Sequence, residues 1–144
     1  PYVAAEENPF GLFDALALLC WGVGFAFEAG GDWQLAQFKA NPANKGKVLD
    51  QGFWKYTRHP NYFGDAAVWW GYGLLSVASG SYWPMIGPLL MTGLIIQVSG
   101  VRLLERTLLD AKPEYRDYVE RTSAFIPWPP KAFTSSRATS QQES

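Results

Sequence analysis

Residues 52–65 hold the densest group of chemically capable side chains, and they read Gly-Phe-Trp-Lys-Tyr-Thr-Arg-His-Pro-Asn-Tyr-Phe-Gly-Asp. Pro60 biases His59 away from helical backbone and is itself favoured at the first position of a helix. The first turn of that helix would offer free amide donors and the positive end of the helix dipole. With Arg58 beside it and Lys47 in the preceding loop, the segment predicts a site for an anion such as a phosphate or a carboxylate.

Asn61 and Asp65 lie four residues apart on the predicted helix, so they share one face. We expect this face, with Tyr62 next to it, to point to the place where Arg58 and His59 gather. A second interpretation fits the same residues, because basic and aromatic side chains also form belts where a helix enters a membrane. From the residues alone, both interpretations stay open.

Two other segments could complete such a site. The end of the first predicted helix carries polar residues at helical spacing on one face, either as the wall of a site or as a solvated helix end. Beyond the last apolar segment, Glu105 and Arg121 could join residues 58–65, although a single exposed ion pair is usually weak. The residues on the helix face are Glu28, Asp32, Leu35 and Lys39.

The elements that must position these residues are predicted from the distribution of charge. Residues 66–101 contain no Asp, Glu, Lys or Arg, which is too long for one membrane helix and suits two of ~20 residues each. We expect spans at about 62–79 and 83–103, joined by a tight turn, and a further span at about 10–30. The alternative for these apolar runs is the core of a soluble helical protein.

The first helix is expected to outlast the membrane. Its pattern continues from Phe10 to about Lys39, which is roughly 45 Å at 1.5 Å per residue, against a hydrocarbon core of ~30 Å. A short amphipathic helix is expected at about 113–121. The predicted fold is therefore all-α: an integral membrane bundle over residues 1–130, with about three transmembrane helices and a short cytoplasmic C-terminal helix. Residues 131–144 are polar and predict a disordered tail.

The positive residues predict the orientation of this bundle. They cluster between the first and second spans and again after the third, so both regions are expected in the cytoplasm. A bacterial inner membrane fits this pattern. The sequence starts with Pro1 rather than Met, and three spans resemble the C-terminal part of a larger bundle, so we expect N-terminal helices of the same protein as partners, besides the bilayer.

Composition excludes several classes of function. The net charge of −1 argues against a nucleic-acid-binding protein. One cysteine and one histidine cannot build a zinc site from these two residue types, and no metal site is expected. The chain contains no phosphate-binding P-loop, no complete dinucleotide fingerprint and no GxSxG motif. Any nucleotide must therefore bind to helix ends and loops.

The 52–65 segment, followed by Trp69-Trp70-Gly71, strongly resembles the bacterial "domain of unknown function 1295" group. Members of that group resemble the C-terminal domain of membrane steroid 5-alpha reductases. The resemblance covers about residues 28–130, and its features are the 28–35 helix end, Gly52, the Asn61-Tyr62-Phe63-Gly64-Asp65 block and the ending Tyr118…Arg121…Phe125-Ile126-Pro127.

The resemblance implies a helical membrane enzyme that reduces a C=C bond conjugated to a ketone with NADPH. It implies that Asn61 and Asp65 contact the nicotinamide end, and that Asp32, with Glu28 in place of a usual Asn, lines the nucleotide cleft. Lys47, where Arg is usual, and Arg121 would meet phosphates. Glu105 stands roughly where the reductases have His. Their substrate-side acids lie in a half that is not in this chain, so no catalytic residue is assigned.

The Arg58-His59-Pro60 triplet before Tyr62 and Gly64 also resembles the RHPxYxG pattern of isoprenylcysteine carboxyl methyltransferases. That resemblance implies S-adenosylmethionine as the cofactor at the same cytoplasmic position. Asn61 and the acidic residue at 65 favour the reductase, and the Arg-His pair favours the methyltransferase. The sequence thus predicts an NADPH-dependent reductase of a steroid- or lipid-like enone, with the methyltransferase as the alternative. A third hypothesis, a lipid-binding or assembly subunit, would bind no nucleotide.

Overall fold

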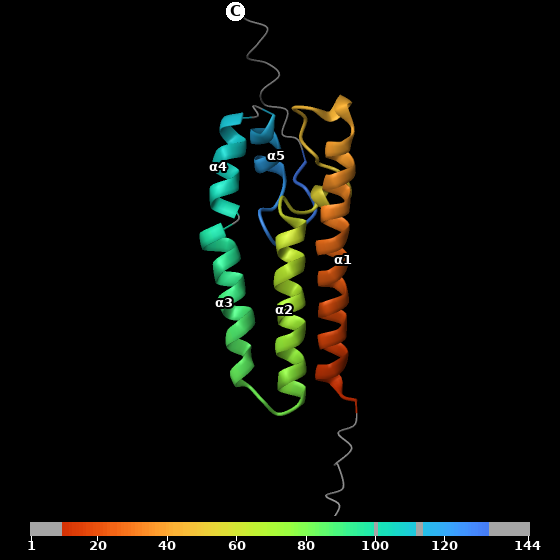
Figure 1. Ribbon diagram of the computed structural model, residues 1–144, viewed down its shortest axis with the longest axis vertical. Coiled ribbons are helices and arrows are strands. Elements are labelled where there is room, and N and C mark those ends of the chain that lie inside the picture. The colour runs from red at the N-terminus through yellow and green to blue at the C-terminus, as the bar shows by residue number, and fades with distance from the viewer. Residues whose placement is uncertain (1–9, 100, 112–113, 133–144) are drawn as a thin grey trace, which may run out of the picture.

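The computed structural model describes residues 10–99, 101–111 and 114–132, and over these residues the secondary structure is entirely helical (Figure 1). This confirms the predicted all-α fold. Most of the predicted disordered tail, residues 133–144, lies outside the described residues.

The first helix, α1, runs from Leu12 to Ala40 and agrees closely with the expected helix from Phe10 to Lys39. Asn41 ends it in extended backbone, and its side chain caps the short 3-10 turn η1 (Pro42–Asn44) by accepting from the Ala43 amide. Over the described residues, α1 is the one helix that is both long and apolar enough to cross a membrane by itself.

The second helix, α2 (Pro60–Ala78), begins at the predicted proline and follows the 3-10 turn η2 (Gly52–Lys55). After a turn in which Gly80 has a positive φ of 83°, η3 (Trp83–Met85) leads into α3 (Ile86–Leu94). Figure 1 shows α2 between α1 and α3.

The predicted span at 83–103 is not one continuous helix. A π-helical turn, η4 (Ile95–Ser99), follows α3, and a separate helix, α4 (Val101–Ala111), comes after it. Over the described residues, the apolar helix Trp83–Gln97 is shorter than a typical span. The change of helix type coincides with the return of charged residues at Arg102, so the break falls where the environment is expected to change from lipid to water. The number of spans therefore stays a prediction.

Small residues bring α1 and α2 into close contact. A Cβ atom added at Gly24 would lie 2.6 Å from the Val68 backbone nitrogen, and one added at Gly64 would collide with the α1 backbone. Ala17 and Gly31 are also buried in this contact. Helices in lipid associate through this kind of close van der Waals packing, because lipid tails provide no hydrophobic drive between them.

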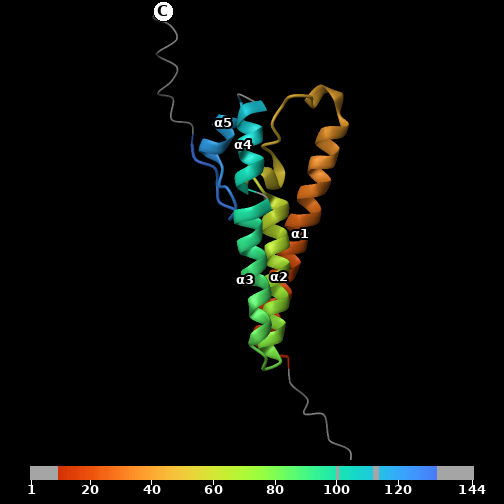
Figure 2. The same ribbon diagram turned by 60° about the vertical axis from the view of Figure 1, so that its left-hand side comes forward.

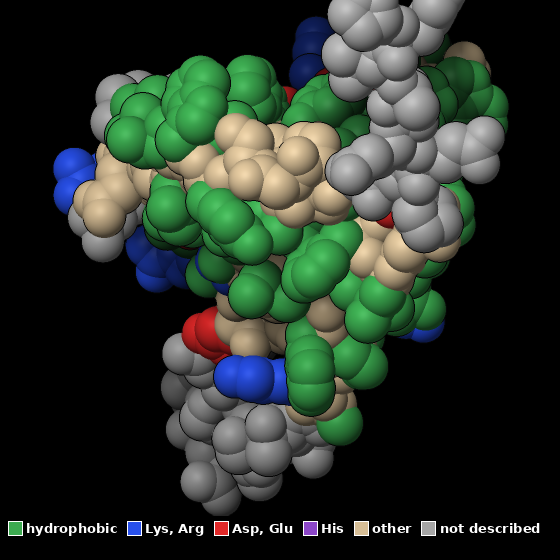
Figure 3. Space-filling model, turned by 90° about the horizontal axis from the view of Figure 1, so that it is seen from below, with side chains coloured by type: hydrophobic (Ala, Val, Ile, Leu, Met, Phe, Trp, Pro, Cys, Tyr) green, Lys and Arg blue, Asp and Glu red, His purple; other side chains and the backbone are tan. Residues whose placement is uncertain are grey.

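The other faces of α1 and α3 expose large apolar side chains. Leu19, Phe25 and Leu89 are each more than half exposed. Seen from the α2–α3 turn, the surface is mainly hydrophobic (Figure 3). Exposed apolar area of this extent is unusual for a soluble monomer and normal for a lipid-facing surface. Together with the length of α1, it indicates a membrane protein.

Beyond the apolar part, α4 and the short helix α5 (Tyr115–Arg121) face the upper end of α1. The short helix agrees with the predicted one at 113–121. Figure 2 shows that the upper end of α1 leans away from α4 and α5, and that the 41–51 loop crosses between them.

Candidate functional site

The predicted gathering of Asn61 and Asp65 with Arg58 and His59 is wrong, because the two pairs face different partners. The Asn61 side chain turns toward α1, where its Nδ2 donates to Asp32 Oδ1 at 3.0 Å. Glu28 lies on the same side of the α1·α2 contact, within electrostatic reach of Asp32 and Asp65. These four residues form the polar seam: Glu28, Asp32, Asn61 and Asp65.

Arg58 and His59 instead meet Glu105 on α4. Glu105 Oε1 accepts from Arg58 Nε at 2.8 Å and lies 3.2 Å from His59 Nε2. The His59 ring also stacks on Tyr62, with 5.5 Å between the ring centroids. The divergence has a backbone cause: His59 is extended, with φ −136° and ψ 63°, whereas Asn61 already lies in the first turn of α2. Glu105, which was expected to join residues 58–65, thus contacts Arg58 and His59.

Burial and charge act in opposite directions on Glu105. Burial alone would raise the pKa of its carboxyl group, but the hydrogen bond with His59 and the positive charge of Arg58 outweigh it, so the pKa is lowered. Arg58 is buried and Glu105 is mostly covered, which strengthens this ion pair relative to one in water. Glu105 is therefore held as a carboxylate at neutral pH.

Residues 54–58 also fix the C-terminal segment, chiefly through its backbone. Arg58 Nη1 donates to the carbonyl oxygens of Val119 and Thr122, and the Arg58 amide donates to that of Ser123 at 2.9 Å. The Thr57 hydroxyl donates to the Phe125 carbonyl at 2.9 Å. This contact places α5 opposite α1.

Two tyrosines of α5 are buried against this contact. Tyr118 donates its hydroxyl to the Trp54 carbonyl. Burial raises the pKa of Tyr115 to about 12 and raises that of Tyr118 further. Both groups therefore remain neutral hydroxyls over the physiological range.

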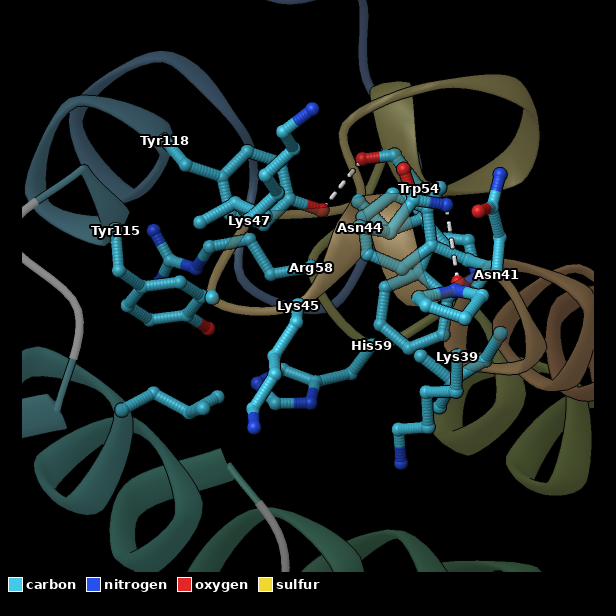
Figure 4. A pocket seen from close by; sticks show the side chains of 17 residues that line it. Lys39, Asn41, Asn44, Lys45, Lys47, Trp54, Arg58, His59, Tyr115 and Tyr118 are labelled. Carbon is cyan, nitrogen blue, oxygen red and sulfur yellow. Dashed lines mark hydrogen bonds between the residues drawn. The ribbon is translucent and has the colours of Figure 1, made fainter.

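A cavity of about 460 Å³ lies between the end of α1, the 41–49 loop, α4 and α5. In Figure 4, Tyr115 and Tyr118 line it from one side and Lys39 and Asn41 from the other, with Lys45 and His59 between them. Its wall combines lysine side chains with aromatic and aliphatic surface. Among its lining residues are Leu35, Lys39, Lys45, Trp54, Arg58 and His59.

The predicted site residues divide into three groups. Lys47, Arg58 and His59 line the cavity, and Glu105 supports it by holding two of them. The polar seam and Tyr62 do not line it. Arg121 pairs with Asp50, at 3.2 Å between Nη2 and Oδ2.

Sequence reasoning missed several cavity residues. Lys45, Trp54, Tyr115 and Tyr118 were not assigned to a site, and Lys39 was placed only on a helix face. Two weak signals pointed to them: the Lys45-Gly46-Lys47 triplet in a loop, and two tyrosines three residues apart on a short helix, where they share a face.

The arrangement is suited to binding a flat, anionic ligand. Ammonium groups attract phosphates or carboxylates, and aromatic side chains provide surfaces on which rings can stack. The described residues contain no group of three His, Cys, Asp or Glu side chains that could hold a metal ion.

Comparison with known proteins gives the family. The family model "Protein of unknown function (DUF1295)" matches residues 2–122. Delta(14)-sterol reductase erg24 of Schizosaccharomyces pombe is 32% identical over 87 residues, which is 51% of this chain and 20% of the relative. The chain thus spans about a fifth of the length of that curated relative. No solved structure matches. Because the family match covers most of the sequence, the chain belongs to the DUF1295 family.

Proposed function

We propose that this chain is the cofactor-binding part of a membrane reductase that uses NADPH. Its substrate would be an apolar, steroid- or lipid-like molecule with a C=C bond conjugated to a ketone. The observation that carries the proposal is the cavity between the lysine-bearing loop and α5, whose mixed lining suits phosphates joined to flat rings. The sterol reductase relative supports a reductase as the class of enzyme.

The residues suggest a direction for the bound cofactor. Leu35 and Lys39 line the cavity, and Asp32 continues the same α1 face toward the apolar part of the bundle, where it binds Asn61. We assign phosphates to the lysine end and the nicotinamide carboxamide to the polar seam, because a carboxamide needs both a donor and an acceptor.

The cofactor would supply a hydride to the β-carbon of the enone, and the chain would orient it. Lys39 and Lys45 would hold the phosphate charge, and the Asn61 amide would fix the nicotinamide ring. The aromatic wall formed by Trp54 and Tyr118 would cover the part of the cofactor that lies in the cavity and exclude water from it. No residue of this chain is assigned as the acid that protonates the product.

Calorimetry on the purified protein in detergent, with NADPH and S-adenosylmethionine in parallel, tests the proposal. We expect NADPH to bind, and Asn61→Ala to weaken it about tenfold through the loss of one hydrogen bond of ~1.4 kcal/mol. Gln37→Ala is the control, since Gln37 is an exposed amide of α1 that does not line this cavity. Unchanged NADPH affinity in both Asn61→Ala and Asp65→Ala would reject the assignment of the seam.

The phosphate end has its own matched pair of variants. Lys45→Ala should weaken NADPH binding and reduce the dependence of that binding on salt, because one ammonium-to-phosphate contact is lost. Lys55→Ala removes an exposed lysine that lies outside the cavity and should leave the affinity unchanged. Equal effects of the two variants would indicate a general charge effect instead of a site.

A methyltransferase remains the second candidate, because Arg58 and His59 both line the cavity. S-adenosylmethionine also joins a flat base to charged groups, and the same cavity could hold it. In that case S-adenosylmethionine would bind in the calorimetric experiment, NADPH would not, and His59→Ala would abolish the binding. If neither ligand binds, the N-terminal helices expected as partners are restored and binding is measured again before the non-enzymatic hypothesis is accepted.

We also propose that the protein lies in a bacterial inner membrane with the cavity on the cytoplasmic side. The bilayer and the apolar substrate would be its partners. The basic residues of the 39–58 loop and of the C-terminal segment support this orientation. Labelling of a cysteine placed at Glu120 from one side of sealed inverted or right-side-out vesicles would establish the sidedness.

A further inference from the structure

Outside the cavity, an apolar and basic surface lies where the C-terminal segment crosses the start of α2. Ile126 is 65% exposed, Trp128 is 69% exposed and Tyr56 is 42% exposed. The Trp128 amide donates to the Tyr56 carbonyl at 2.9 Å, which joins the two segments. We call this surface the interfacial patch and define it as Lys55, Tyr56, Ile126, Trp128 and Lys131.

The backbone of this segment has no unsatisfied N–H donor. Within residues 127–130, three are prolines, which have no N–H group, and the fourth amide is the Trp128 donor that Tyr56 already satisfies. An unsatisfied backbone donor costs several kcal/mol in the hydrocarbon region of a bilayer. Residues 127–130 carry no such donor, so placing them at a lipid surface avoids this cost.

Charge identifies the kind of surface. The Lys55 ammonium lies 5.9 Å from the centre of the Tyr56 ring, and Lys131, also exposed, follows the prolines. The nearby Asp50 carboxylate is paired with Arg121. Tryptophan and tyrosine with flanking lysines are the residue types that gather at the headgroup level of membranes, and lysines there attract anionic lipids.

The patch is also continuous with the apolar part of the bundle. Phe125 packs edge-on against Phe63 of α2, with 6.0 Å between the ring centroids, and Phe63 packs in turn against Phe27 of α1 at 5.1 Å. A row of aromatic rings thus leads from the exposed apolar helices to the C-terminal segment, on the side of the α1·α2 contact away from the polar seam.

We infer that the interfacial patch docks the C-terminal segment onto the headgroup layer of an anionic bilayer. Since Arg58 and Thr57 bind carbonyls both of α5 and of the segment that follows it, this contact would hold the aromatic wall of the cavity at a fixed height above the membrane. The inference rests on the proposed membrane location, but not on which cofactor the cavity binds.

The accessibility of attached spin labels to relaxation reagents tests this inference on the whole chain in lipid nanodiscs. Cys20 is replaced by serine, whose hydroxyl can keep the hydrogen bond to the Ala67 carbonyl, and single cysteines are placed at Ile126, Glu120 and Leu89. In discs containing phosphatidylglycerol, we compare the accessibility of each label to oxygen with its accessibility to a water-soluble nickel reagent. We expect this ratio to be severalfold higher for the label at Ile126 than for the label at Glu120. Lys55→Gln with Lys131→Gln should reduce this preference, and so should phosphatidylcholine alone.

The Leu89 label separates two kinds of failure. If Leu89 is in lipid and Ile126 is as aqueous as Glu120, the patch is not at the membrane and the inference is overturned. If Leu89 is aqueous as well, the membrane location itself is wrong. An immobile Ile126 label that neither reagent reaches would mean that protein covers the patch, which also overturns the inference.

Discussion

The contact between α1 and α2 and the contact between residues 54–58 and the C-terminal segment are held by different forces. The first relies on glycines and alanines such as Gly24, Gly64 and Ala17, which allow the backbones to approach closely. The second relies on polar groups, above all Arg58 and Thr57, which bind backbone carbonyls.

The difference follows the environment of each contact. In lipid, apolar side chains gain little by leaving the solvent, so shape decides how helices pack. Outside the hydrocarbon core, a loop and a short helix cannot bury much apolar area, and specific hydrogen bonds from buried donors hold them instead. Variants can therefore be designed that break one contact at a time.

Breaking the polar contact should have the largest effect. Arg58→Ala leaves Glu105 mostly covered without its arginine partner and frees two backbone carbonyls, and we expect a loss of about 3–5 kcal/mol in the free energy of unfolding. Thermal unfolding in detergent measures it, with Arg116→Ala, an exposed arginine of α5, as the control. Equal stability of the two variants would show that Arg58 does not hold the segment.

Breaking the close helix contact comes next. Gly64→Val would force atoms into the α1 backbone, and we expect a loss of about 1–3 kcal/mol from overpacking. Gly22→Val is the matched control, because a Cβ atom at Gly22 would meet nothing within 4 Å. If both variants are equally stable, the small residues of the α1·α2 contact do not determine how the two helices pack.

The pH dependence of stability sharpens the comparison, because only the polar contact should titrate in this way. The pKa of Glu105 is lower in the folded protein than its ordinary value of 4.5. The stabilisation is therefore complete above about pH 4.5 and is lost as the pH falls through the folded value. Thermal unfolding at decreasing pH should show this loss, and Glu105→Gln should remove that part of the dependence. A variant that keeps the same slope would assign the titration to another group.

The smallest effect is expected at Arg121. Its ion pair with Asp50 is about one-third exposed on both sides, and solvent screens it, so Arg121→Ala should cost less than about 1 kcal/mol. The same variant reports on the role implied by the family resemblance: weaker NADPH binding at unchanged stability would support a phosphate contact. Unchanged affinity would leave Arg121 as a surface residue.

The sequence predicted the elements well, because the signals for them are local. Each signal lies within one continuous stretch of the chain: the absence of charge over 66–101, Pro60 at a helix start and the helical spacing at 113–121. The break at Ile95–Ser99 escaped prediction, since the apolar pattern runs through it unchanged.

The site was harder to predict, because its direction depends on contacts between distant segments. Helical spacing correctly placed Asn61 and Asp65 on one face, but it gave no information on which neighbour that face meets. Whether His59 turns with them or away depends on Glu105, 46 residues further along the chain. The cavity likewise depends on how the C-terminal segment folds back, which no local pattern reveals.

The acceptors that Arg58 and Thr57 use have a consequence for protein engineering. They are main-chain carbonyls of residues 119, 122, 123 and 125, which every amino acid provides. The attachment of the C-terminal segment is therefore largely indifferent to the side chains at those positions. Libraries at these positions, which do not line the cavity, could therefore vary this segment while the hydrogen bonds that attach it persist.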